Sequence, residues 1–235
     1  MTYQQKIRHL YGVDKVKKFG FSESEIVELE KREGLKRIME IAVLLFNDFE
    51  TLDVFGPVEI FGRLTDLYSI KYYSLTGGLI TNKHGVSILT NHIESIESEL
   101  EIFLIPGGIG TRIEVKNDLL LEKIKAISEK SNYVLTVCTG SALLAKTGLL
   151  DNRNATTNKR AYYWAITNGK KVKWDKTARW AVDEKYYTSS GVSAGIDMSL
   201  GFLSDRHGIE FARKIAFEIE YNWTEDKNND VFKIE

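Results

Sequence analysis

The stretch YVLTVCTGSALLAKTGLL, residues 133–150, gives the clearest indication of the fold class of this chain. Its first five residues form the short apolar run that is typical of a buried parallel strand, and a helix-forming run begins directly after them, near Thr139. Cys138 stands at the junction, and Gly140 follows in the first turn of the expected helix. This strand–turn–helix arrangement is typical of a nucleophile elbow, in which a sharp turn presents a reactive side chain.

Strand-like and helix-like stretches alternate on both sides of this segment. Strands are predicted at 41–46, 69–75 and 133–137, and the stretch 101–108 is predicted to be an apolar strand that runs into a glycine turn. A hairpin is predicted over 79–89, and strand-like pieces at 154–157, 171–174 and 178–189. Helices are predicted at 51–64, 118–130, from 139 onward, at 194–206 and at 209–222. The alternation implies right-handed crossovers and an α/β sandwich whose mostly parallel central sheet is covered on both faces.

The first 38 residues differ from the rest of the chain in composition. They hold nine Lys or Arg residues and six acids, and Ser22 with Glu25 forms a capping-box pattern before a charged run that stops at Gly34. We expect one helix near 23–33, packed on the main domain or on a second subunit. The chain is thus divided into an N-terminal helical extension (1–38), an α/β domain (39–225) and a C-terminal tail (226–235).

Composition narrows the choice of partners. The 32 Lys and Arg residues nearly balance the 33 Asp and Glu residues, so charge gives no reason to expect nucleic acid. One cysteine excludes an internal disulfide framework and a cysteine-based zinc site, and four scattered histidines argue against a histidine-rich metal site. No apolar run approaches the roughly 18 residues of a spanning helix, and the N-terminus has no apolar signal region. We expect a cytoplasmic protein with no membrane contact.

Candidate site residues stand at three strand ends, where open α/β sheets form their sites. Cys138 is either a nucleophile, solvent-reachable and with a pKa lowered by the helix N-terminus, or a buried structural cysteine. The turn at 105–110 is either a source of backbone N–H groups for a developing negative charge or an ordinary glycine turn. Asp53 is either a proton-transfer group or the N-cap of the following helix.

Five stretches together resemble the ThiJ/PfpI superfamily over about residues 40–222. They are IAVLLFNDFETLDVFGP, IFLIPGGIG, VLTVCTGSALLAKTGLL, NATTNKRAYYWA and SSGVSAGIDMSL. The resemblance is closest to the isocyanide hydratase branch and to the related sensor domains of some AraC-type regulators. It implies a flavodoxin-like three-layer sandwich, usually a homodimer, that acts on a small molecule without a cofactor or a metal.

The resemblance also implies roles for individual residues. Cys138 corresponds to the nucleophile, Asp53 to its acidic partner, and Thr139 to the residue whose hydroxyl or backbone N–H orients the site. The positions that correspond to substrate- or oxyanion-binding residues are Gly108, a backbone donor near the thiolate, together with Ile109 and Val192.

The chain departs from the pattern of its relatives at two places. Protease-like and glyoxalase-like members carry a histidine directly after the cysteine, where this chain has Thr139. Hydratase-like members usually have a histidine where this chain has Asn158, and His207 with Glu210 does not match the His-x-Glu pair of the glutaminases. The resemblance implies a hydratase that converts an organic isocyanide to an N-substituted formamide. The alternatives are a protein whose cysteine senses oxidants or reactive molecules and, with the neighbouring histidine missing, a glyoxalase or deglycase.

Overall fold

A computed structural model of the chain describes residues 38–96 and 99–234. The N-terminal extension and the helix that we predict near 23–33 lie outside the described residues, and the division of the chain into three parts stays a prediction.

The centre of the described part of the chain is an eight-stranded sheet with the strand order β3-β4-β2-β1-β5-β6-β10-β9. Its strands are β1 (Met39–Leu44), β2 (Tyr68–Ser74), β3 (Gly78–Thr81), β4 (Ser87–His92), β5 (Ile102–Ile105), β6 (Tyr133–Thr136), β9 (Trp180–Asp183) and β10 (Tyr186–Ser189). All neighbouring pairs are parallel except those at the two edges, β3 with β4 and β9 with β10. The mostly parallel sheet that the alternating pattern predicted is confirmed.

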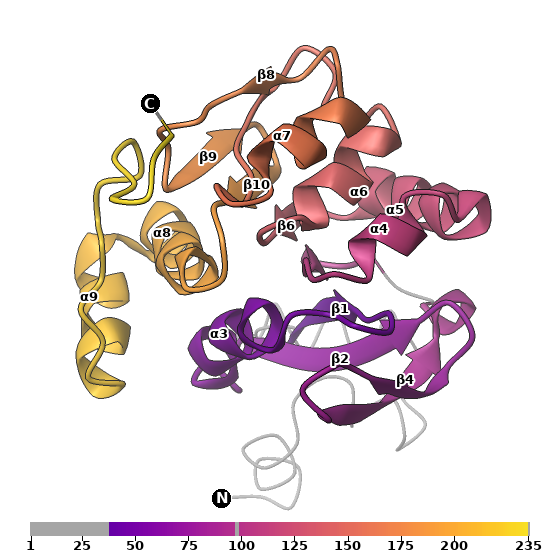
Figure 1. Cartoon of the computed structure of the whole chain (residues 1–235). Coiled ribbons are helices and arrows are strands. Elements are labelled where there is room, and N and C mark those ends of the chain that lie inside the picture. Colours follow the sequence, from indigo (N-terminus) through magenta and orange to yellow (C-terminus); the bar gives the residue numbers. More distant parts are fainter. Residues whose placement is uncertain (1–37, 97–98, 235) are drawn as a thin grey trace, which may run out of the picture.

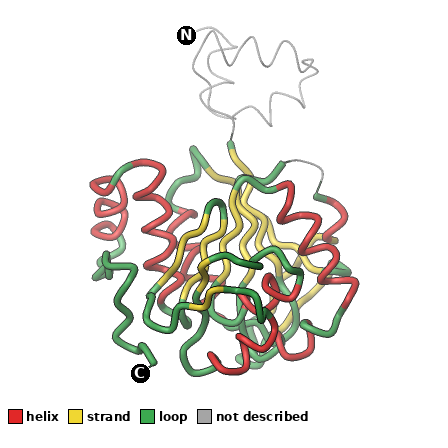
Figure 2. The backbone as a smooth tube through the Cα atoms, turned by 90° about the horizontal axis from the view of Figure 1, so that it is seen from above, coloured by secondary structure: helices red, strands yellow, loops and turns green. Residues whose placement is uncertain are grey.

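Helices cover both faces of this sheet (Figures 1 and 2). They are α3 (Thr51–Gly62), α4 (Thr111–Glu114), α5 (Asp118–Lys130), α6 (Gly140–Lys146), α7 (Tyr162–Ala165), α8 (Ala194–His207) and α9 (Ile209–Glu218), with 3-10 turns η1 (Ile93–Ser95) and η2 (Ile166–Asn168). On one face α8 packs between α3 and α9, and on the other α6 packs against α4 and α5. This is the three-layer sandwich expected from the resemblance.

The hydrophobic core lies between the sheet and the helix layers. The central strands β1 and β5 are apolar along almost their whole length, and all four residues of β5 are fully buried. Continuous apolar runs of this kind fit strands with helices on both faces. Phe61 of α3 and Phe202 of α8 meet edge to face with ring centroids 5.9 Å apart, which joins these two helices.

Three expected elements differ from the structure. The single strand predicted over 178–189 is a hairpin, and its turn places Glu184 in the left-handed region at φ +52°. The pieces predicted at 154–157 and 171–174 shorten to β7 (Asn154–Ala155) and β8 (Lys173–Trp174), which pair with each other outside the main sheet. The hairpin was missed because its turn contains no glycine, asparagine or proline to mark it.

None of the described helices is long and apolar enough to cross a membrane. The cytoplasmic location and the homodimer stay predictions.

Candidate active site

Cys138 lies at the carboxyl end of the central sheet, between β6 and α6. Its backbone is in the left-handed region at φ +58°, which is costly for a residue with a side chain and is found mainly at functional sites. The turn is tight because the backbone of α6 passes directly over the end of β5. A Cβ at Gly140 would lie 2.3 Å from the carbonyl oxygen of Ile105, so only glycine fits there. The elbow predicted from 133–150 is therefore present.

Three N–H donors surround the Cys138 sulfur. The side-chain amide Nδ2 of Asn158 lies 3.1 Å from Sγ. The backbone N–H groups of Thr139 and Val192 also hydrogen-bond the sulfur and favour its thiolate form. Val192 reaches this position through a left-handed backbone at φ +50°, an outlier for a β-branched residue. Two strained residues thus meet at the same sulfur.

The thiol itself is buried, and only 5% of Cys138 is exposed. Burial, followed by the nearby charge of Asp53, raises the pKa of Cys138 above its ordinary value, and the three N–H donors oppose this shift without reversing it. The expectation of a solvent-reachable thiol with a lowered pKa is therefore wrong. The helix N-terminus was readable from the sequence, whereas the burial that outweighs it depends on how distant segments close over the sulfur.

Asp53 lies in the first turn of α3 and is completely buried. Its Oδ2 accepts a hydrogen bond from the backbone N–H of Gly107 at 2.9 Å, and its Oδ1 has no partner among the described residues. Burial raises the pKa of this carboxyl well above its ordinary value, although the Gly107 bond opposes the shift. The N-cap position of α3 belongs to Glu50, so the alternative role of Asp53 as a helix cap is wrong.

Gly107 is the point at which the acid and the elbow meet. A Cβ built there would lie 2.6 Å from the backbone nitrogen of Thr139 and 2.8 Å from Oδ2 of Asp53. A side chain at this position would push the two apart. The glycine turn at 105–110 therefore lets three segments, which are far apart in the sequence, approach one another closely.

Thr139 links the elbow to the same glycine turn through its hydroxyl. Its Oγ1 accepts hydrogen bonds from the backbone N–H of Gly108 and from the Thr111 hydroxyl, both at 3.1 Å. The Gly108 N–H is thus engaged by Thr139 rather than by the sulfur. Ile109 is half exposed and is not among the residues that line the cavity beside the thiol. Substrate contacts of Gly108 and Ile109 stay predictions.

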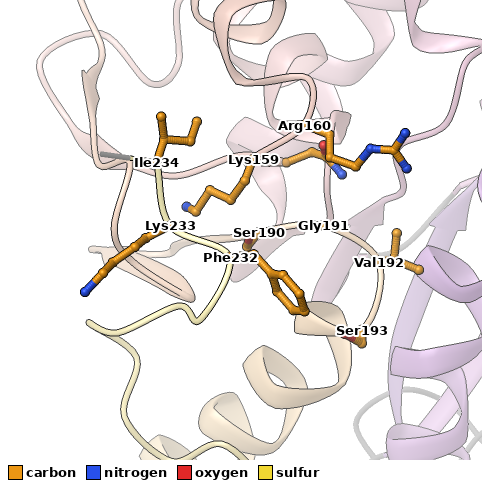
Figure 3. A pocket seen from close by; sticks show the side chains of 10 residues that line it. Lys159, Arg160, Ser190, Gly191, Val192, Ser193, Phe232, Lys233 and Ile234 are labelled. Atoms are coloured by element: carbon orange, nitrogen blue, oxygen red, sulfur yellow. The ribbon is translucent and has the colours of Figure 1, made fainter.

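A cavity of about 480 Å³ adjoins this cluster (Figure 3). Two of its walls come from segments that touch the sulfur, the one at 158–160 and the loop at 190–193, and the third comes from residues 232–234. Asn158 and Val192 line the cavity and also hydrogen-bond the Cys138 sulfur, whereas Cys138 and Asp53 themselves are not among the lining residues. Among the described residues, no three His, Cys, Asp or Glu side chains gather closely enough to hold a metal ion.

Sequence reasoning missed two parts of this site. Asn158 stood out as a departure from the relatives, but its residue type alone did not reveal that it donates to the sulfur. No sequence pattern predicted that residues 232–234 line the cavity, because this depends on where the chain packs after α9.

An α/β sandwich with a strained cysteine at the end of a central strand and a buried acid beside it defines a class of proteins. The DJ-1/PfpI family profile matches residues 39–205, and the chain belongs to this family. Isonitrile hydratase from Pseudomonas putida is 27% identical over 185 residues, which cover 78% of each protein. The HTH-type transcriptional regulator GbdR from Pseudomonas aeruginosa is 25% identical over 187 residues, or 75% of this chain and 49% of the regulator.

The fold is likewise similar to solved structures. A ThiJ/PfpI family protein from Pseudomonas syringae superimposes with a TM-score of 0.72 at 24% sequence identity, covering 80% of this chain and 76% of that protein. DJ-1beta from Drosophila melanogaster superimposes with a TM-score of 0.69 at 16% identity. These likenesses confirm the expected fold.

Proposed function

We propose that this protein is a cysteine-dependent hydratase that adds water to an organic isocyanide and releases an N-substituted formamide. Two things support the proposal: the similarity to isonitrile hydratase over most of both chains, and the pair formed by Cys138 and Asp53. The single observation that carries it is the buried Asp53 carboxyl, whose pKa is raised and whose Oδ1 has no partner among the described residues. Such a group holds its proton to a higher pH than an ordinary aspartate does, and it can deliver that proton next to the sulfur.

The first half of the reaction is addition of the thiol across the terminal carbon. The sulfur of Cys138 bonds to that carbon, and the carbon lone pair takes a proton from Asp53. The proton of the thiol replaces the one that Asp53 gave up. The carbon–nitrogen bond order falls from three to two, and the product is a thioimidate, R–N=CH–S, attached to Cys138.

The second half is addition of water to the thioimidate. The water oxygen bonds to the same carbon, and one water proton passes to the nitrogen with Asp53 as the relay. The carbon–sulfur bond of the tetrahedral intermediate then breaks, and the sulfur leaves with the bonding electron pair. The hydroxyl proton passes to the sulfur and restores the thiol. The products are R–NH–CHO and the free thiol, so one isocyanide and one water give one formamide.

The remaining residues of the site position and stabilise this pair. The three donors around the sulfur, from Asn158, Thr139 and Val192, stabilise negative charge on it when it attacks and when it leaves. The hydroxyl of Thr139 holds the Gly108 turn, whose neighbour Gly107 orients Asp53. The buried setting favours the reaction because few water molecules solvate the Cys138 sulfur before the substrate enters.

The proposal is tested by product analysis with ethyl isocyanide. Wild-type protein is expected to accumulate N-ethylformamide well beyond one equivalent per subunit. Cys138→Ala is expected to produce none because it has no nucleophile, and Cys138→Ser is expected to produce none because a serine alkoxide is far harder to form near neutral pH. A stable one-to-one adduct on Cys138 without released formamide would contradict the proposal.

A sensor role is the second candidate, and the match to transcriptional regulators is the observation that favours it. It predicts a single stoichiometric modification of Cys138 and no turnover. The burial and raised pKa of the thiol weigh against it, because oxidation of cysteine follows thiolate character and exposure.

A further inference from the structure

One wall of the cavity beside Cys138 comes from the C-terminal segment 227–234, which lies beyond the family match at residues 39–205. Phe232, Lys233 and Ile234 supply this wall. In Figure 3 the ring of Phe232 extends toward the loop that carries Val192, whereas the side chain of Lys233 points away from it. The segment that we expected to be a simple tail therefore shapes the cavity.

Hydrogen bonds fix this segment on the domain. The backbone N–H of Arg179 donates to the carbonyl of Lys227 at 2.7 Å, and the backbone N–H of Asp230 donates to the carbonyl of Thr177 at 2.8 Å. Arg179 and Thr177 lie just before β9, so the wall is attached beside the edge strand of the central sheet.

The buried side chain of Asp230 joins the wall to the interior. Its Oδ1 accepts hydrogen bonds from Nη1 of Arg179 at 3.4 Å and from the backbone N–H of Phe232 at 3.1 Å. The Arg179 guanidinium also donates to Asp197 on α8 at 2.7 and 2.9 Å and to the Ser193 hydroxyl at 3.1 Å. One arginine therefore holds both the loop wall, through Ser193, and the C-terminal wall, through Asp230.

Phe232 offers an apolar surface that the described residues leave largely uncovered. The residue is 67% exposed, although it lines the cavity. An exposed aromatic ring in a concave site gains free energy when a ligand covers it, because its apolar area is then removed from water. The cavity volume also far exceeds the two atoms of an isocyanide group, which leaves room for an apolar substituent beside the ring.

We propose that segment 227–234 is the specificity wall of this site, at which Phe232 contacts an apolar, ring-bearing substituent of the substrate. Asp230 is the positioning residue that holds Phe232 in place. The proposal rests on the proposed function for the identity of the reacting group, but the contact between Phe232 and the substituent can be measured separately from turnover.

The first experiment compares benzyl isocyanide with ethyl isocyanide as substrates of wild type, Phe232→Ala and Val231→Ala. Val231 is the matched control because it is exposed, apolar and adjacent but does not line the cavity. Phe232→Ala is expected to lower kcat/KM for the benzyl compound about tenfold, mainly through KM, and to leave the ethyl compound within about twofold. An equal loss for both substrates, or no loss for the benzyl compound, would overturn the proposal.

The second experiment separates the wall from the chemistry. Cys138 is the only cysteine of the chain, so maleimides label a single site. The ratio of the labelling rates with N-benzylmaleimide and N-ethylmaleimide is expected to fall in Phe232→Ala and to stay unchanged in Val231→Ala. If no isocyanide is turned over but this ratio falls, the proposed function is wrong and the proposed contact between Phe232 and the substituent is confirmed. A ratio that stays constant or rises in Phe232→Ala would contradict the proposed contact between Phe232 and the substituent.

Asp230 is tested by a split between KM and kcat. Asp230→Ala removes the acceptor of the Phe232 N–H and is expected to raise KM for benzyl isocyanide several-fold at unchanged kcat. Asp230→Asn keeps an oxygen acceptor and is expected to restore most of the wild-type KM. Equal KM values in wild type and Asp230→Ala would contradict the positioning role.

Discussion

The side-chain amide of Asn158 donates a hydrogen bond to the sulfur of Cys138 at 3.1 Å. An amide cannot exchange a proton at neutral pH as an imidazole can, so Asn158 stabilises charge on the sulfur but transfers no proton. Proton transfer in the proposed reaction therefore falls to Asp53, the other polar side chain that acts on the thiol.

Replacement of Asp53 separates thiol reactivity from catalysis. Asp53 loses its proton before the Cys138 thiol does, and its charge then raises the pKa of Cys138. Asp53→Asn removes that charge, so the midpoint pH of alkylation by iodoacetamide is expected to fall. Turnover of ethyl isocyanide is expected to fall by a factor of about 100 or more, because the proton donor is lost. A variant with both a higher midpoint and full turnover would remove Asp53 from the mechanism.

The raised pKa of Asp53 also makes stability depend on pH. Above its ordinary value of 3.8, the folded protein holds a proton that the unfolded chain has released. The contribution to stability is complete below that value and is lost as pH rises through the folded pKa, so the free energy of unfolding falls over this range. Asp53→Asn removes this dependence, and its melting temperature relative to wild type is expected to rise from pH 4 until the pH passes the folded pKa of Asp53, and to stay level above it.

Asp66→Asn is the control for this measurement, since Asp66 is an exposed acid outside the site. Its melting temperature is expected to follow that of wild type at every pH. A constant difference between Asp53→Asn and wild type across the pH range would show that Asp53 is ionised alike in the folded and unfolded states.

The bond from Asn158 is expected to lower the pKa of the thiol. Asn158→Ala removes the donor and should raise the midpoint pH of alkylation. Asn158→Asp places a negative charge beside the sulfur and should raise the midpoint further, while it keeps the oxygen that accepts the Ala161 N–H. The midpoint is the correct readout, because absolute rates also change with access to the sulfur. The midpoint pH is expected to increase from wild type to Asn158→Ala to Asn158→Asp. A lower midpoint in Asn158→Ala than in wild type would show that Asn158 does not lower the pKa of the thiol.

Thr139 is expected to contribute to stability through its hydroxyl. Thr139→Val keeps the shape of the side chain but leaves the buried N–H of Gly108 without its acceptor, at a cost of about 1–3 kcal/mol in the free energy of unfolding. Thr139→Ser keeps the hydroxyl and should cost much less. Urea denaturation measures both variants, and equal stability of the two would show that the hydroxyl bond contributes nothing.

Much of the fold could be predicted because parallel strands and their helices leave local patterns. The apolar run of β5 and the alternation around it indicated the sheet without any knowledge of distant contacts. The hairpin of β9 and β10 could not be predicted, because Glu184 adopts a left-handed turn that its residue type does not favour.

The site divides along the same line. The elbow of Cys138 is local and was visible, whereas the burial that raises its pKa results from the closure of distant segments over it. The hydrogen bond between Asp230 and Phe232 is local in sequence. The position of Asp230 in the fold, however, depends on its bond to Arg179, which lies 51 residues earlier in the chain. Long-range packing of this kind has no local signature.

In the proposed reaction Cys138 forms a covalent intermediate that water then releases. Rapid-quench mass spectrometry of wild-type protein during turnover of ethyl isocyanide tests it most directly. The expected result is a species heavier by one isocyanide molecule, located on Cys138, that appears before N-ethylformamide and decays as the formamide passes one equivalent. Formation of N-ethylformamide by Cys138→Ala at the wild-type rate, with no such species in the wild-type protein, would contradict it.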